Sequence, residues 1–125
     1  MKLRSKLGQS RGLGSAKSGV GHWKAQRISA IALIPLVVWF IASFVVMLPA
    51  PFYVVYEWMQ SPWTIVGMIS LATAMFYHGY LGIQVVIEDY IPHEGTRFAL
   101  LLICKFASIF MGLLAVVSCL IILLK

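Results

Sequence analysis

The run ISAIALIPLVVWFIASFVVML, Ile28–Leu48, decides the fold class of this chain. It contains no charged residue, and it exceeds the roughly 20 residues that a helix needs to cross about 30 Å of hydrocarbon. Two further long apolar stretches follow it, Trp63–Ile87 and Phe98–Leu124. A membrane β-barrel would need at least about eight short alternating segments instead. The sequence therefore predicts an all-α membrane protein with three transmembrane helices.

The composition agrees with a membrane-embedded chain. Of the 125 residues, 61% are hydrophobic and only 11% are charged, whereas a soluble domain averages roughly 45–50% and about 25%. We expect a basic arm at residues 1–27 and a membrane anchor at residues 28–125. Gly19 and Gly21 disfavour a regular helix in the arm. Pro35 predicts a kink in the first span, and Pro49–Pro62 is expected to be an irregular connection rich in aromatic residues.

The charge distribution predicts the orientation in the membrane. Before the first span the basic residues are Lys2, Arg4, Lys6, Arg11, Lys17, Lys24 and Arg27, and no acid accompanies them. The connection Pro49–Pro62 carries Glu57 and no Lys or Arg. Because Lys and Arg are in excess on the cytoplasmic side, we expect a cytoplasmic N-terminus and a periplasmic C-terminus. The basic arm then contacts lipid headgroups, and nucleic acid is not an expected partner.

The N-terminal segment also bears on the compartment. A secretory signal has an apolar region of about 7–15 residues, which Ile28–Leu48 exceeds. A mitochondrial presequence is the alternative, since Met1–Ser18 is free of acids and rich in Lys, Arg, Ser and Gly. The stretch RGLGSAKSG has little amphipathic periodicity, so the bacterial inner membrane is preferred over the mitochondrial one. Cys104 and Cys119 lie about 22 Å apart along one helix and are interpreted as packing residues.

The second span contains a histidine, in YHGYLGIQVVIEDY, Tyr77–Tyr90. His78 lies about 13–14 Å from the inner end of the span, near the middle of the membrane, where ionisable residues are costly and usually face a partner, a cavity or a cofactor. Ala74 and Gly82 flank it by one turn, so a flat macrocycle would have room beside the imidazole. Alternatively, His78 is hydrogen-bonded to a neighbour at a close helix contact. The spacing alone leaves both interpretations open.

The end of the same run carries an acidic pair and a tyrosine. Asp89 lies within about 20° of His78 around the helix and roughly 16 Å from it along the axis. Glu88, Asp89 and Tyr90 therefore mark the cytoplasmic interface. They either form a solvated helix end with an aromatic anchor or belong to a quinone site, where a phenol donates to a carbonyl and a carboxylate relays protons.

The segments SAKSGVGHWKAQRISAIALIPL and YHGYLGIQVVIEDY together resemble the small membrane-anchor subunit of succinate dehydrogenase, the type with cytochrome b-556, particularly in alphaproteobacteria and mitochondria. The resemblance covers essentially the whole chain. It implies that His78 is one axial ligand of the haem b iron. The second ligand would come from a larger cytochrome b anchor subunit, since His22 and His93 lie in interfacial segments.

The resemblance also implies a quinone site and further partners. Tyr90 would hydrogen-bond the ubiquinone carbonyl, and Asp89 would be the neighbouring acid. Arg27 would lie near the haem propionates and the quinone pocket, and a guanidinium forms strong paired hydrogen bonds with carboxylates. His22 is a weaker candidate for this region. The flavin and iron–sulfur centres would belong to flavoprotein and iron–sulfur subunits, so this chain carries no catalytic residue of its own.

Two other classes of protein remain as alternatives. A small transporter would be expected to carry an acid inside the membrane, whereas all four acids lie at span ends or in connections. In a structural or assembly anchor without haem, His78 would only pack. A haem absorbance band in the purified complex would distinguish the cytochrome b-556 anchor from both of these classes.

Overall fold

The computed structural model describes residues 19–125, which contain four helices and no strand. The helices are α2 (Gly19–Met47), α3 (Phe52–Gln60), α4 (Pro62–Tyr90) and α5 (Glu94–Leu124). Three of them, α2, α4 and α5, are long and apolar enough to cross a membrane. The predicted all-α fold with three spans is confirmed. The expectations for Met1–Ser18 lie outside the described residues.

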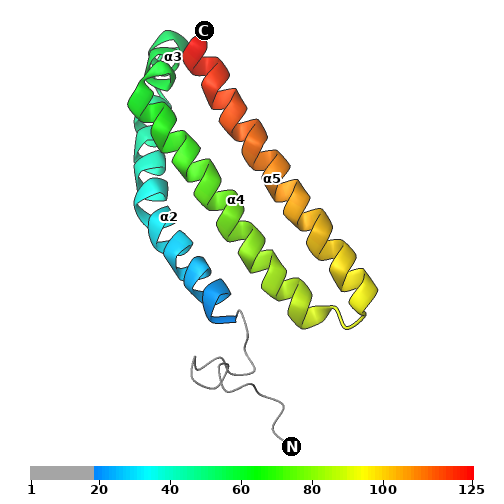
Figure 1. The fold of residues 1–125 in the computed structure, drawn as a ribbon. Coiled ribbons are helices and arrows are strands. Elements are labelled where there is room, and N and C mark those ends of the chain that lie inside the picture. Colours follow the sequence, from blue (N-terminus) through cyan, green and yellow to red (C-terminus); the bar gives the residue numbers. More distant parts are fainter. Residues whose placement is uncertain (1–18) are drawn as a thin grey trace, which may run out of the picture.

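The three long helices run alternately up and down in a row (Figure 1). The central helix is α4, which packs against α2 on one side and α5 on the other. The start of α2, the end of α4 and the start of α5 form one end of the bundle, drawn at the bottom of Figure 1 and called the lower end below. Helix α3 and the C-terminus form the upper end. This arrangement brings Arg27, Asp89 and Tyr90 to the lower half of the molecule.

Helix α2 begins earlier than expected. The prediction that Gly19 and Gly21 keep the segment before Ile28 out of a regular helix is wrong for residues 19–27, which are helical. Each glycine costs about 1 kcal/mol in a helix, but the segment extends a long apolar helix, and propagation gains one hydrogen bond per residue. The helix continues through Pro35 and follows a curved path in Figure 1.

The connection between the first two spans contains a helix that the sequence did not predict. Helix α3 begins after Pro51, and the amide of Val54 donates to the carbonyl of Pro51 at 3.0 Å. It ends at Gln60, and Ser61 alone separates it from Pro62, the first residue of α4. The prolines of this connection bound α3 and do not enter it: Pro51 is its extended N-cap, and Pro62 stands at the first turn of α4, where its fixed φ is favourable. Trp58 of α3 packs on Trp39 of α2, with ring centroids 6.4 Å apart.

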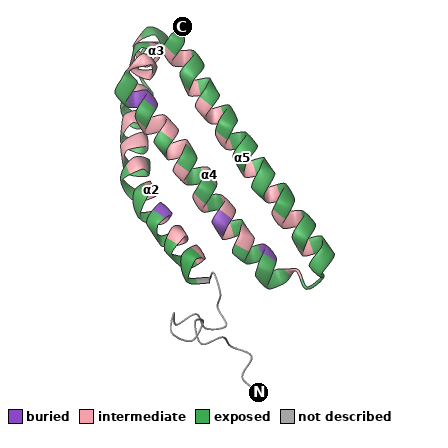
Figure 2. Ribbon diagram, in the orientation of Figure 1, coloured by how far each residue is buried: buried purple, intermediate pink, exposed green. Residues whose placement is uncertain are grey.

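Few side chains are buried within this chain alone. The buried apolar residues are Ile65, Leu81 and Ile87, and the buried polar ones are Ser29 and Thr64. Figure 2 shows exposed positions along the whole length of α2, α4 and α5. Apolar surface of this extent needs lipid or a protein partner to cover it. Ser29 is thus one of two polar side chains that are buried within the described part of the chain.

Candidate functional site

The imidazole of His78 faces α2. Its Nδ1 lies 3.0 Å from Oγ of Ser29, and that hydroxyl donates its hydrogen to the carbonyl of Gln26 at 3.0 Å. A serine hydroxyl has one proton and two lone pairs. Ser29 therefore accepts from the Nδ1–H group of His78. This contact fixes the tautomer in which Nε2 carries the lone pair.

The second ring nitrogen of His78 has a weaker neighbour. The side-chain amide nitrogen of Gln26 lies 3.5 Å from Nε2, which is long for a hydrogen bond. Gly82 lies one turn below His78, and a Cβ atom built there would sit 3.6 Å from the same amide nitrogen. The side chain of Gln26 thus occupies the space that Gly82 leaves beside the histidine.

Two polar atoms of α2 are buried without a hydrogen-bond partner in the described part of the chain. They are Nε2 of His22 and Oε1 of Gln26. His22, Gln26 and Ser29 are spaced by four and three residues, so they share the face of α2 that packs on α4. Buried polar atoms normally have hydrogen-bond partners. This face therefore retains capacity to bind a polar group.

These contacts fit an axial ligand of haem. A histidine that binds a metal almost always donates its other ring N–H group to a neighbour, which fixes the ring and raises its basicity. His78 meets this condition through Ser29, and Nε2 has only the long contact with Gln26. Among residues 19–125 no three His, Cys, Asp or Glu side chains gather to hold a metal ion. A haem bound between two chains would need only one ligand from each.

Arg27 is not brought to the histidine. It lies about 160° around α2 from Ser29, its guanidinium carbon sits 5.5 Å from the ring centroid of Trp23, and the side chain is exposed. A cation over an indole face is a favourable contact. Arg27 is therefore available to a group that approaches from outside this chain, and it does not contact His78.

Asp89 and Tyr90 are the last two residues of α4. Both side chains are exposed, and 78% of Tyr90 is accessible. Tyr90 lies about 18 Å along the helix from His78, because twelve residues separate them. The neighbouring Glu88 accepts a hydrogen bond from the amide of Gln84 at 2.8 Å. The predicted residues thus lie at two levels, with His78 between the helices and the Asp89–Tyr90 pair at the lower rim.

Sequence reasoning missed Ser29 and Gln26 as neighbours of His78. The signal is the spacing within HWKAQRIS, which places the uncharged polar side chains of His22, Gln26 and Ser29 on one face of the helix. Which residues of α4 meet this face depends on how far the two helices slide past each other. The sequence contains no feature that fixes this offset.

The fold and these contacts define a class, a three-span helical membrane protein with a polar cluster between its first two spans. The family model of the succinate dehydrogenase/fumarate reductase transmembrane subunit matches residues 1–122, and the chain belongs to this family.

Curated relatives agree with the family match. A succinate dehydrogenase hydrophobic membrane anchor subunit of Rickettsia bellii is 32% identical over 107 residues, 86% of either chain. The subunit of the same name from Rickettsia conorii is 31% identical over 104 residues, 82% of either chain. That of Rickettsia typhi is 30% identical and also covers 82% of both chains. No solved structure matches the chain. The resemblance based on the two sequence segments is confirmed.

Proposed function

We propose that this chain anchors a succinate:quinone oxidoreductase, respiratory complex II, in a bacterial inner membrane. It would hold the flavoprotein and iron–sulfur subunits beside the membrane together with a larger cytochrome b anchor subunit. It would also supply one axial ligand of haem b and part of the ubiquinone site. The proposal rests on the family match and, above all, on the His78–Ser29 hydrogen bond, which leaves the lone pair of Nε2 for a ligand.

In the haem site, this chain contributes ligation and orientation. Nε2 of His78 would bind the iron, and Ser29 would hold the ring through Nδ1. The amide of Gln26 would move aside, since its contact of 3.5 Å with Nε2 is weak. Arg27 would pair with a propionate that approaches from outside the chain. A haem with two imidazole ligands accepts and releases one electron without binding substrate.

In the quinone site, this chain contributes a donor and a proton relay. The exposed phenol of Tyr90 would donate a hydrogen bond to one carbonyl of ubiquinone. Reduction of ubiquinone to ubiquinol takes two electrons and two protons. The electrons would come from succinate through the partner subunits, and Asp89 would pass protons from the aqueous phase. Both side chains stand at the end of α4, where water and membrane meet.

The lower end of the bundle would face the cytoplasm. Lys24, Arg27 and Arg97 lie near this end, whereas Lys125 is the basic residue at the upper end within the described part of the chain. The excess of basic residues agrees with a cytoplasmic position. The quinone site would then lie on the side where the soluble subunits are made and assembled.

A difference absorbance spectrum of the purified complex, reduced minus oxidised, tests the proposal. A low-spin haem b band is expected, and mass analysis should identify a flavoprotein and an iron–sulfur protein in the same preparation. An intact complex without haem would rule out the role of His78 as a ligand. Purification of the chain without those subunits would contradict the anchor function itself.

A structural anchor without haem is the second candidate, because His78 does have a hydrogen-bond partner on α2. In that case the contacts of Gln26 and Ser29 with His78 would only join two helices. The two unpartnered polar atoms on the same face of α2, Nε2 of His22 and Oε1 of Gln26, favour the haem site over this candidate. The same spectrum distinguishes them.

A further inference from the structure

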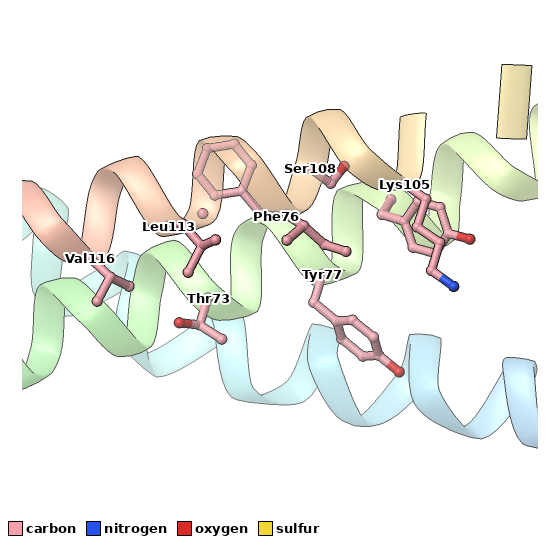
Figure 3. A pocket seen from close by; sticks show the side chains of 10 residues that line it. Thr73, Phe76, Tyr77, Lys105, Ser108, Leu113 and Val116 are labelled. Carbon is pink, nitrogen blue, oxygen red and sulfur yellow. The ribbon is translucent and has the colours of Figure 1, made fainter. Parts of the chain in front are cut away.

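A second feature lies on the opposite side of α4 from His78. A groove of about 370 Å³ runs between α4 and α5, and its surface is almost entirely apolar (Figure 3). Tyr80, which lines it, is about 160° around α4 from His78. Along α5 the lining extends from Lys105 to Val116, which corresponds to about 16 Å. The volume is within the usual range of ligand sites, roughly 300–1,000 Å³, and the shape is elongated along the helices.

Lys105 places a positive charge inside the third span. It lies eight residues beyond Arg97, or about 12 Å farther along α5 from the lower end. Side chains on a helix tilt toward its N-terminus, and Figure 3 shows the Lys105 nitrogen at the end of the groove nearer the start of α5. A lysine at this depth extends its ammonium group toward the interface. The ammonium thus approaches the headgroup region of the lower leaflet.

No acid of the chain neutralises this charge. Glu57 lies in α3 at the opposite end of the bundle, and Glu94 forms an ion pair with Arg97 at 4.0 Å. Glu88 and Asp89 lie eight and nine residues beyond Tyr80, about 12 and 13–14 Å along α4, and Glu88 accepts a hydrogen bond from Gln84. Within residues 19–125, Lys105 forms no ion pair. Ionisable residues inside a membrane usually have a partner, so the anion must come from outside the chain.

We propose that the groove binds an anionic phospholipid of the lower leaflet. One acyl chain lies along α5 past Gly112 toward Val116, where the surface is apolar and elongated. The phosphate pairs with the ammonium group of Lys105, and the phenol of Tyr80 supplies a further donor at the same site. Phosphatidylglycerol has this chemistry, because it combines a net negative charge with two acyl chains.

Charge and shape favour a lipid over a partner helix. A carboxylate brought by a partner's span would have to lose its water in the membrane, which is costly. A lipid phosphate already carries its charge at the interface that Lys105 approaches. Basic pockets between spans on the cytoplasmic side are a recognised mode of anionic lipid binding. The groove therefore suits a lipid that is present wherever the chain is inserted.

Photocrosslinking of the complete complex tests this inference. The complex is reconstituted in phosphatidylcholine nanodiscs that contain a small fraction of either phosphatidylglycerol or phosphatidylcholine with a diazirine on one acyl chain. After illumination, mass spectrometry quantifies lipid adducts on the α4 and α5 peptides around Tyr80 and Gly112. We expect phosphatidylglycerol to label these peptides more than phosphatidylcholine does. Lys105→Gln should reduce that excess about fivefold, equivalent to about 1 kcal/mol, the usual contribution of one Lys near an anionic membrane.

Two variants control for charge and assembly. Lys105→Arg retains the cation and should retain the excess, and so should Lys24→Gln, which removes an equal charge at the lower end outside the groove. The subunit composition and the haem spectrum of Lys105→Gln should be unchanged. Equal labelling by the two lipids, or an excess that survives Lys105→Gln, would overturn the proposal. Groove peptides without lipid adducts would also overturn it and would assign the groove to a partner helix.

Discussion

At the scale of single residues, one hydroxyl group determines how the ring of His78 is presented. Ser29 is only 7% exposed, and it accepts from Nδ1 while donating to the carbonyl of Gln26. The histidine itself could be singled out from the sequence, because an imidazole in the middle of an apolar span is unusual. Its partners could not, since they lie 49 and 52 residues away on another helix. Arg27 does not contact His78 within this chain, and its expected place near the haem propionates and the quinone pocket stays a prediction.

Replacement of His78 by alanine should remove the axial ligand from this chain. We expect a change from a low-spin to a high-spin haem spectrum or a loss of haem, because one of two imidazoles is missing. The spectrum of the purified complex measures it. His93→Ala is the matched control, since His93 is an exposed N-cap of α5 and should leave the spectrum unchanged. A low-spin spectrum that persists in His78→Ala would show that another residue is the ligand.

Replacement of Ser29 by alanine should weaken haem binding without removing the ligand. The N–H group of His78 then loses its acceptor, and loss of such a partner typically lowers metal affinity by about 10- to 100-fold. Haem content per complex, titrated with added haem, measures the change. Ser29→Thr keeps the hydroxyl and should retain haem. Equal haem affinity in Ser29→Ala and the unsubstituted chain would reduce Ser29 to a packing residue.

Replacement of Tyr90 by phenylalanine removes one hydroxyl and keeps the ring. If the phenol donates to a quinone carbonyl, its loss should cost about 1–3 kcal/mol, or about 5- to 150-fold in quinone reduction. Succinate oxidation with a water-soluble acceptor should stay near normal, because in the proposed complex that chemistry would belong to the flavoprotein and iron–sulfur subunits. The haem spectrum should also persist, since Tyr90 is about 18 Å along the helix from His78. Full quinone reductase activity in an assembled variant would exclude Tyr90 from the site.

At the scale of elements, the long apolar runs predicted the three spans to within a few residues at most ends. The start of α2 and the whole of α3 differ from the prediction because glycine and proline do not end a helix by their presence alone. A glycine costs about 1 kcal/mol in a helix, and the growing α2 helix offsets this with one hydrogen bond per residue. The prolines of the connection only bound α3, with Pro51 as its N-cap. The sequence also does not predict how far the helices are shifted along one another. This shift depends on contacts between distant residues, such as the indole of Trp39 on α2 and Gly67 on α4.

Gly67 lets α2 approach α4. A Cβ atom added there would meet the indole of Trp39 at 2.6, 2.8 and 3.0 Å, and Trp39 is already packed on Trp58. We expect Gly67→Ala to displace the indole and to destabilise the helix pair by about 1–3 kcal/mol, as overpacking usually does. Thermal stability of the purified complex, followed by retention of haem, measures this effect. Gly79→Ala is the matched control, because nothing lies within 4 Å of its added Cβ, and equal loss in both variants would contradict the packing argument.

At the scale of the whole molecule, orientation in the membrane decides which aqueous phase the Asp89–Tyr90 pair faces. The fold places Glu57 at one end of the bundle and Glu94 at the other. The excess of Lys and Arg near the lower end predicts that this end is cytoplasmic. In a chain with Cys104 and Cys119 replaced by serine, a membrane-impermeant thiol reagent added to intact cells should label Glu57→Cys and spare Glu94→Cys. After the membrane is permeabilised, both positions should react, which controls for access. The opposite pattern in intact cells would put Asp89 and Tyr90 on the periplasmic side, away from the flavoprotein and iron–sulfur subunits, and would contradict the proposed quinone site.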